Sequence, residues 1–188
     1  MKIKYTNRFL SFLLFVIPLF FTPNAFAGIS DGLVAYYPFN GAANDASGNG
    51  NNGTVAGATL TEDRFGNASS AYSFDGNDDK ITVSDAPALN FGTGSFTLAV
   101  WIQNNQSGIW KRILTKRGSA SYWYSLSIYS GKARLEISAG VSLDSTVAIN
   151  DNAWHFLLVK RDTTAGVFSL YVDGELPSTM SDAGQNLN

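Results

Sequence analysis

The clearest pattern of apolar and polar positions in this 188-residue chain lies between Trp154 and Gly174. From Val167 to Val172 apolar and more polar side chains alternate with a period of two, which is typical of a half-buried strand. Phe156–Val159 is apolar at every position, as expected of a strand covered on both faces. Because the loop Asp162–Gly166 ends in glycine, which accepts a positive φ, the pattern predicts a β-hairpin.

Short apolar runs separated by turn residues recur along the rest of the chain, roughly every 8 to 12 residues. We expect strands at Leu33–Phe39, Thr54–Leu60, Ala71–Phe74, Lys80–Val83, Phe96–Ile102, Arg112–Lys116, Tyr124–Tyr129, Arg134–Ser138 and Ser145–Ile149. No apolar pattern of helical period is long enough for a helix of three turns. The sequence therefore predicts an all-β antiparallel sandwich or jelly roll in a single domain.

Residues 1–27 have the pattern of an export signal. Three basic residues precede the uncharged apolar run Phe9–Phe21, and Ala25-Phe26-Ala27 offers the small residues that a signal peptidase accepts. The alternative, a transmembrane helix, is disfavoured because spanning a bilayer needs about 20 apolar residues. We therefore expect a signal peptide at 1–27 and a mature domain at 28–188, secreted or at the cell surface or in the periplasm, without stable membrane insertion.

The charge and the cysteine content of the chain exclude some classes of function. The chain has 13 basic and 15 acidic residues, and removing the signal would leave ten basic residues against fifteen acidic ones. A mildly acidic protein without a basic run is a poor candidate for binding nucleic acid. The absence of cysteine excludes disulfides and an N-terminal lipidated cysteine.

Five stretches follow one another from Gly32 onward: GLVAYYPFNGAANDASGNGNNGTVAGATL, DRFGNASSAYSFDGNDDKITV, SFTLAVWI, WHFLLVKRD and LYVDGE. In order and spacing they resemble the bacterial laminin-G-like jelly roll of the concanavalin A-like lectin/glucanase superfamily. The resemblance implies a non-catalytic binding domain, often with a structural calcium. Since that family normally continues into further strands, it also implies that closing strands lie beyond Asn188.

Catalysis is not supported by the acidic residues. Glycoside hydrolysis needs two carboxyl groups roughly 5 to 9.5 Å apart, and the glucanase branch of the superfamily places them on one strand as Glu-x-Asp-x-Glu. The chain has three glutamates, Glu62, Glu136 and Glu175. Glu136 lies in a strand pattern, but its alternate positions are Arg134 and Ser138, so no catalytic pair is available there. His155 is the single histidine, no G-x-S-x-G motif accompanies it, and we interpret it as structural. We expect no enzymatic activity and no zinc site.

Two loops are rich in oxygen ligands. The first carries Asp45 and Asn49, and the second is the turn that contains Asp75, Asp78 and Asp79. Carboxylate and amide oxygens on flexible loops suit Ca²⁺, so these five residues are candidate ligands of a structural calcium. The alternative is that Asp and Asn form the turns themselves by hydrogen bonding to their own backbone.

Aromatic residues divide into two groups. Those within strand patterns are interpreted as core residues: Phe74, Phe96, Trp101 and Trp154. Those in loop-like sequence beside basic residues form a candidate ligand-binding set: Trp110, Arg117, Tyr122 and Trp123. Aromatic faces beside polar donors suit a sugar ring or a protein partner, whereas ordinary edge packing would use the same residues.

These observations favour a secreted, non-catalytic binding module whose partner is a glycan or an extracellular or cell-surface protein. Calcium is its one candidate cofactor. The alternative is an N-terminal structural module of a larger surface protein or glycoside hydrolase.

Overall fold

The described residues form an all-β structure of antiparallel strands. The computed structural model describes residues 28, 30–106, 108, 110–117, 123–137 and 140–187. The chain divides into two units at Gly32, and the strands belong to the second unit, Leu33–Asn188. In the first unit, the backbone N–H of Asp31 donates to the carbonyl oxygen of Gly28 at 2.9 Å. The described residues contain no helix long and apolar enough to cross a membrane.

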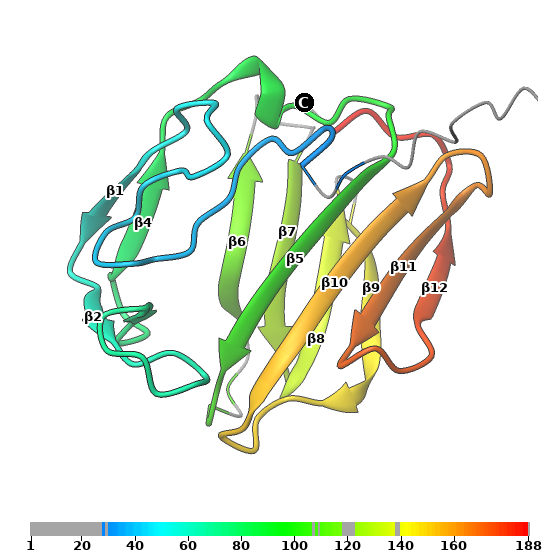
Figure 1. Cartoon of the computed structure of the whole chain (residues 1–188). Helices are drawn as coiled ribbons and strands as arrows, with labels where there is room; N and C mark the ends of the chain where they lie inside the picture. Colours follow the sequence, from blue (N-terminus) through cyan, green and yellow to red (C-terminus); the bar gives the residue numbers. More distant parts are fainter. Residues whose placement is uncertain are drawn as a thin grey trace, which may run out of the picture. The chain divides into compact units, whose positions relative to one another are not determined.

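Two four-stranded sheets make up most of the second unit (Figure 1). The first has the order β12 (Ser178–Ser181), β11 (Val167–Val172), β10 (Trp154–Asp162) and β5 (Phe96–Gln103). The second has the order β6 (Lys111–Arg117), β7 (Trp123–Tyr129), β8 (Lys132–Ile137) and β9 (Val141–Ala148). Two small sheets pair β1 (Gly53–Ala56) with β4 (Lys80–Val83) and β2 (Thr59–Thr61) with β3 (Ala71–Ser73), and a 3₁₀ helix, η1, spans Pro87–Leu89.

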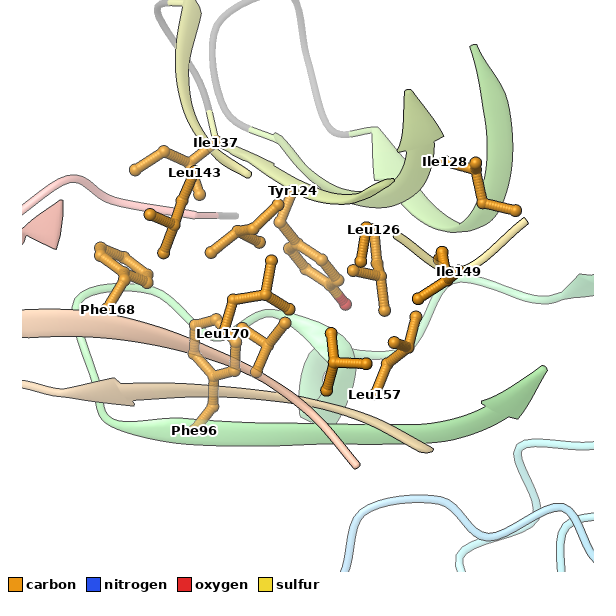
Figure 2. Packing of buried hydrophobic residues seen from close by; sticks show 14 of the residues in the cluster. Phe96, Tyr124, Leu126, Ile128, Ile137, Leu143, Ile149, Leu157, Phe168 and Leu170 are labelled. Atoms are coloured by element: carbon orange, nitrogen blue, oxygen red, sulfur yellow. The ribbon is translucent and has the colours of Figure 1, made fainter. Parts of the chain in front are cut away.

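The core lies between the inner faces of the two large sheets (Figure 2). Leu157, Val159 and Phe168 come from the first sheet, Leu126 and Leu135 from the second, and each side chain is at most 1% exposed. Alternate positions of the same strands point outward, because successive side chains of a strand lie on opposite faces. Most outward-facing positions of the large sheets therefore lie outside the core, although Ser125 and Ser127 of β7 are buried.

The hairpin predicted from Trp154–Gly174 is confirmed as β10 and β11. Residues 157–162 pair with residues 172–167 in antiparallel register, and Gly166 has the positive φ, 66°, that the return requires. The all-β antiparallel class is also confirmed.

Two predicted elements are wrong, and one strand was missed. Leu33–Phe39 is not a strand, because its backbone groups bond to loop side chains, such as the Val34 carbonyl to the Asn51 amide. Thr54–Leu60 is divided between β1 and β2. The polar strand β12 has no apolar alternation and was not expected.

Two of the predicted core aromatics are exposed. Trp101 is 40% and Phe74 49% exposed, whereas Phe96 is buried. Trp101 has the same parity as Thr97 and Ala99, and it lies on the outer face of β5 beside Phe156, at a ring-centroid distance of 5.2 Å. Parity within the strand therefore overrides the general preference of tryptophan for the core.

A buried ion pair fastens the C-terminal segment to the core. The Arg161 side chain is fully buried, and its Nε and Nη2 donate to the Asp182 carboxylate at 2.7 and 2.9 Å. Its remaining donors reach the carbonyl oxygens of Gly92 at 3.0 Å and Gln185 at 2.8 Å. The hydrogen bonds from Arg161 lower the pKa of Asp182. One side chain thus joins β10, the loop before β5 and the C-terminal segment.

Replacing Arg161 with methionine should strongly destabilise the fold. The change leaves the Asp182 carboxylate buried without a cation, which costs about 3–5 kcal/mol in comparable pairs. Chemical denaturation followed by circular dichroism measures the loss. The matched control is Lys160→Met, which removes a surface cation paired with Asp162 and should leave the midpoint close to that of the wild type. Equal midpoints for the two variants would contradict the assigned role of Arg161.

His155 occupies the same face of β10 as Arg161, at the other end. It is 7% exposed, and its ring nitrogens lie 2.7 Å from Asp173 Oδ2 and 2.9 Å from Asp151 Oδ1. Burial acts to lower the pKa of His155, but the hydrogen bonds to Asp173 and Asp151 outweigh it, and the pKa is raised above 6.5. Its interpretation as a structural residue agrees with these contacts.

The pH dependence of stability should carry the signature of His155. A raised folded-state pKa gives stability that is fully present below the unfolded pKa of about 6.5 and is lost as the pH rises through the folded pKa. The difference in unfolding free energy between wild type and His155→Gln should therefore be larger at about pH 5.5 than at about pH 9. Denaturation at both pH values tests this, and a difference that grows with pH would contradict it.

Candidate functional site

The outer face of the β6–β9 sheet carries a cluster of aromatic and charged side chains. Trp110 precedes β6, Tyr129 ends β7, Arg134 lies in β8 and Asp144 in β9. The Trp110 and Tyr129 rings are 4.8 Å apart between centroids, with 59° between their planes. The Arg134 guanidinium carbon lies 3.8 Å from the centroid of Tyr129 and 5.4 Å from that of Trp110. We call these four residues the Trp110 cluster.

A bidentate ion pair fixes the cluster. Arg134 Nε and Nη2 donate to Oδ1 and Oδ2 of Asp144 at 2.5 and 2.6 Å, and the two residues are register partners in the β8–β9 ladder. The hydrogen bond to Asp144 raises the pKa of Arg134, and Arg134 lowers that of Asp144. Both groups are therefore charged near neutral pH, and the guanidinium plane is held in place without a ligand.

Trp110 has an unusual backbone conformation. Its φ is 60°, in the left-handed region that non-glycine residues rarely occupy. Such conformations cost of order 1–3 kcal/mol, and they cluster at functional sites. The Trp110 side chain is 42% exposed. Part of its ring is consequently open to a ligand, while the packed part lies against Tyr129.

Only part of the predicted ligand-binding set is brought together. Arg117 and Trp123 are cross-strand partners in the β6–β7 ladder, whereas Trp110 lies at the opposite end of β6. Tyr122 is outside the described residues. The role of the set in ligand binding stays a prediction.

Sequence reasoning did not find Tyr129, Arg134 and Asp144. A signal for them was available in strand parity. Arg134 alternates with the core residues Ala133 and Leu135, and Tyr129 with Ile128. Since alternate residues face outward, the position of each on the outer face follows from the strand assignment. The position of Asp144 beside Arg134 follows only from the register between β8 and β9.

The predicted calcium ligands lie in two separate arrangements. One carboxylate oxygen from each of Asp75, Asp78 and Asp79 lies within 4.8 Å of the other two. The oxygens of Asp45 instead accept backbone N–H groups of Tyr36, Ser47 and Asn51 at 2.9–3.0 Å. Burial acts to raise the pKa of Asp45, but hydrogen bonds outweigh it and lower the pKa to about 2. Asp45 therefore organises its own loop.

Asn49 also has structural partners. Its amide nitrogen donates to the carbonyl oxygens of Leu33 and Val34 at 2.8 and 3.0 Å. This contact ties the glycine-rich loop to the segment before it. The three aspartates of the second turn are the only predicted metal ligands that the described structure groups together, and calcium binding by them stays a prediction.

The family comparison decides what kind of domain carries these features. Residues 40–188 match the family described as Clostridium neurotoxin, N-terminal receptor binding. The chain belongs to this family. It is a family of non-catalytic receptor-binding modules, and the prediction that the chain is not an enzyme is therefore confirmed.

The resemblance to the laminin-G-like domain is wrong. The family match is to a neurotoxin receptor-binding domain, and solved structures of similar fold include the binding domain of a botulinum neurotoxin. The short motifs that suggested laminin-G-like domains mark strands and turns, such as LYVDGE at the end of β11, so they report a shared strand-and-turn pattern rather than membership. The expectation of closing strands beyond Asn188 came from that resemblance and stays untested.

Solved structures with the same fold include the binding domain of a botulinum neurotoxin. A point mutant of HCR D/C is 18% identical, with a TM-score of 0.64, over 86% of this chain and 42% of that chain. The binding domain of botulinum neurotoxin DC in complex with SialylT is 17% identical, with a TM-score of 0.62, over 86% of this chain and 42% of that chain. A structure of botulinum neurotoxin type C, whose cell entry is described as dependent upon interaction with two ganglioside molecules, is 17% identical, with a TM-score of 0.60, over 83% of this chain and 40% of that chain.

This chain thus spans about two fifths of the length of these solved chains. No curated protein matches its sequence.

A calcium titration tests the Asp75–Asp79 turn. If the three carboxylates hold Ca²⁺, saturating calcium should raise the melting temperature relative to EDTA, because binding at a hundredfold excess over Kd adds about 2.7 kcal/mol to stability. Asp78→Asn should abolish the shift, and the exposed Glu175→Gln should leave it intact. Melting temperatures that are equal in calcium and EDTA would contradict a calcium site here.

Proposed function

We propose that this chain is an exported receptor-binding module that recognises a glycan through the Trp110 cluster. The observation that carries the proposal is the arrangement of Trp110, Tyr129 and Arg134, with the guanidinium held over both rings and fixed by Asp144. Membership of a receptor-binding family and the glycan ligands named for two solved relatives support it.

The chemistry of the cluster suits a sugar ring. An exposed indole face can stack on the apolar face of a pyranose, while the neighbouring charged groups offer hydrogen bonds to its hydroxyls. The donors and acceptors are already oriented by the Arg134–Asp144 pair, so little ordering is required on binding. A sugar would replace water on the exposed part of Trp110 and leave the core unchanged.

A protein partner is the second candidate, because tryptophan, tyrosine and arginine are also enriched in protein interfaces. The spacing of polar groups within the cluster favours the glycan. Stacking on an aromatic ring, with a bidentate ion pair beside that ring, provides directional contacts to a ligand the size of one sugar ring. A protein interface would need a surface of several hundred Å² on each partner.

The binding experiment uses immobilised glycans, including SialylT and ganglioside headgroups. Trp110→Ala should weaken binding at least about tenfold, since loss of an interface anchor costs more than about 1–2 kcal/mol. The matched control is Phe65→Ala, which removes a 72% exposed aromatic ring from the β2–β3 loop and should leave binding unchanged.

Circular dichroism of both variants establishes that they fold. If Trp110→Ala binds the glycan as strongly as the wild type does, the assignment of the glycan site to the Trp110 cluster is overturned. Binding of a receptor protein stripped of its glycans, with the same loss in Trp110→Ala, would favour the protein partner.

A further inference from the structure

We propose that the glycan site continues from the Trp110 cluster along β6 and β7 to Arg117 and Trp123, and that it takes a linear acidic oligosaccharide whose negative charges recur along the chain. This inference rests on the proposed function and specifies the ligand of the same face. It is carried by the register of β6, β7 and β8 and by the distribution of charge over their outer face.

The register places both aromatic ends on one face. Arg117 pairs with Trp123, and Arg112 pairs with Ser127. Cross-strand partners point to the same side of a sheet, and the residues from Trp123 to Tyr129 at odd positions all share that side, opposite the core residues Tyr124, Leu126 and Ile128. Trp123 and Tyr129 are six residues apart, or about 20 Å at roughly 3.4 Å per residue.

This length exceeds one sugar ring. A ligand confined to the Trp110 cluster would leave the second aromatic end unused, whereas an extended oligosaccharide can contact both. The residues between the ends are polar: Thr115, Ser125, Ser127, Glu136 and Ser142. Thr115 and Ser142 are exposed and Glu136 is half-buried, so these three can hydrogen-bond to sugar hydroxyls, whereas Ser125 and Ser127 are buried.

One polar atom of the strip has no partner. Ser125 is 1% exposed, and its hydroxyl is buried without a hydrogen bond in the described structure. Buried hydroxyls without a partner are uncommon in folded proteins. Ser125 and Ser127 thus lie beneath the surface of the strip, and its accessible side chains come from β6 and β8 on either side of them.

Charge determines the class of oligosaccharide. The outer face of β6–β8 with its β9 neighbours carries four cations, Arg112, Arg117, Lys132 and Arg134, against two carboxylates, Glu136 and Asp144. The whole chain has a net charge of −2. Positive charge is thus concentrated on this face, which favours an anionic ligand.

The two arginines of β6 are available to the ligand. Among the described residues, no ion pair involves Arg112 or Arg117, whereas Lys116 of the same strand pairs with Asp85, and Lys111 donates to the Gly76 carbonyl at 2.8 Å. Arg112 and Arg117 are exposed and lie five positions apart along an edge strand. Guanidinium groups bind carboxylate and sulfate oxygens in a bidentate manner. A chain with recurring charges can engage both, whereas a single terminal charge can engage only one.

The experiment measures binding of the full chain to heparin oligosaccharides, from the disaccharide to the octasaccharide, by calorimetry at two salt concentrations. Affinity should rise at least about tenfold with length until the strip is spanned, and it should fall with added salt because exposed charge pairs are screened. Cello-oligosaccharides of equal length, which are neutral, should bind more weakly at every length.

Two variants separate this inference from the proposed function. Arg117→Met should reduce the affinity for the octasaccharide to that for the disaccharide and leave the disaccharide unaffected. Trp110→Ala should weaken binding at all lengths. Lys160→Met, which removes an exposed cation from the other sheet, is the control and should behave as the wild type.

Affinity that does not depend on chain length, or an Arg117→Met variant that binds the octasaccharide as the wild type does, would overturn the extended site. If Trp110→Ala still loses its binding of SialylT or ganglioside headgroups in that case, the proposed function stands. Equal binding of a single-stranded DNA of similar charge would show a general polyanion surface and would also overturn the inference.

Discussion

The buried ion pair between Arg161 and Asp182 is the constraint on which the arrangement of the first sheet depends. Taking two charges out of water costs several kcal/mol per ion unless every donor and acceptor is satisfied. Here the guanidinium has the Asp182 carboxylate and two carbonyl oxygens as partners. Because those partners lie in different segments, the contacts can form together only when the C-terminal segment is in place over the core, where Leu187 is fully buried.

Because the core occupies the inner faces of the two large sheets, ligand binding is assigned to an outer face. The apolar sides of the long strands pack between the two sheets. β10 is held at one end by His155 with Asp151 and Asp173, and at the other end by Arg161. Neither outer face is needed for the core. On the β6–β9 sheet the outer positions are polar, aromatic and basic. On the other sheet the outer hollow between Phe156, Leu158, Lys160, Tyr171 and Gly174 is almost entirely apolar, with few groups that could recognise a polar ligand.

The sequence predicted the elements better than the site. Alternation and short apolar runs located β5, β7, β8, β10 and β11. They failed for β12, whose polar residues are held by pairing with β11. They also failed for Leu33–Phe39, whose partners are loop side chains rather than a strand.

The site required information that no single strand contains. Trp110 was singled out because it lies in loop-like sequence beside basic residues. Its partners Tyr129, Arg134 and Asp144 come from three other strands, and they meet only through the registers of β6–β9. The same registers placed Arg117 and Trp123 on that face but at its far end. Short motifs misassigned the family because turns such as Asp-Gly recur in many β proteins.

The most direct test follows the indole N–H resonances of the four tryptophans by NMR during titration with an oligosaccharide. Trp110 and Trp123 lie on the proposed binding face, whereas Trp101 and Trp154 belong to strands of the other sheet. We expect the signals of Trp110 and Trp123 to shift until the site is saturated, while those of Trp101 and Trp154 stay in place. Shifts confined to Trp101 and Trp154 would contradict it.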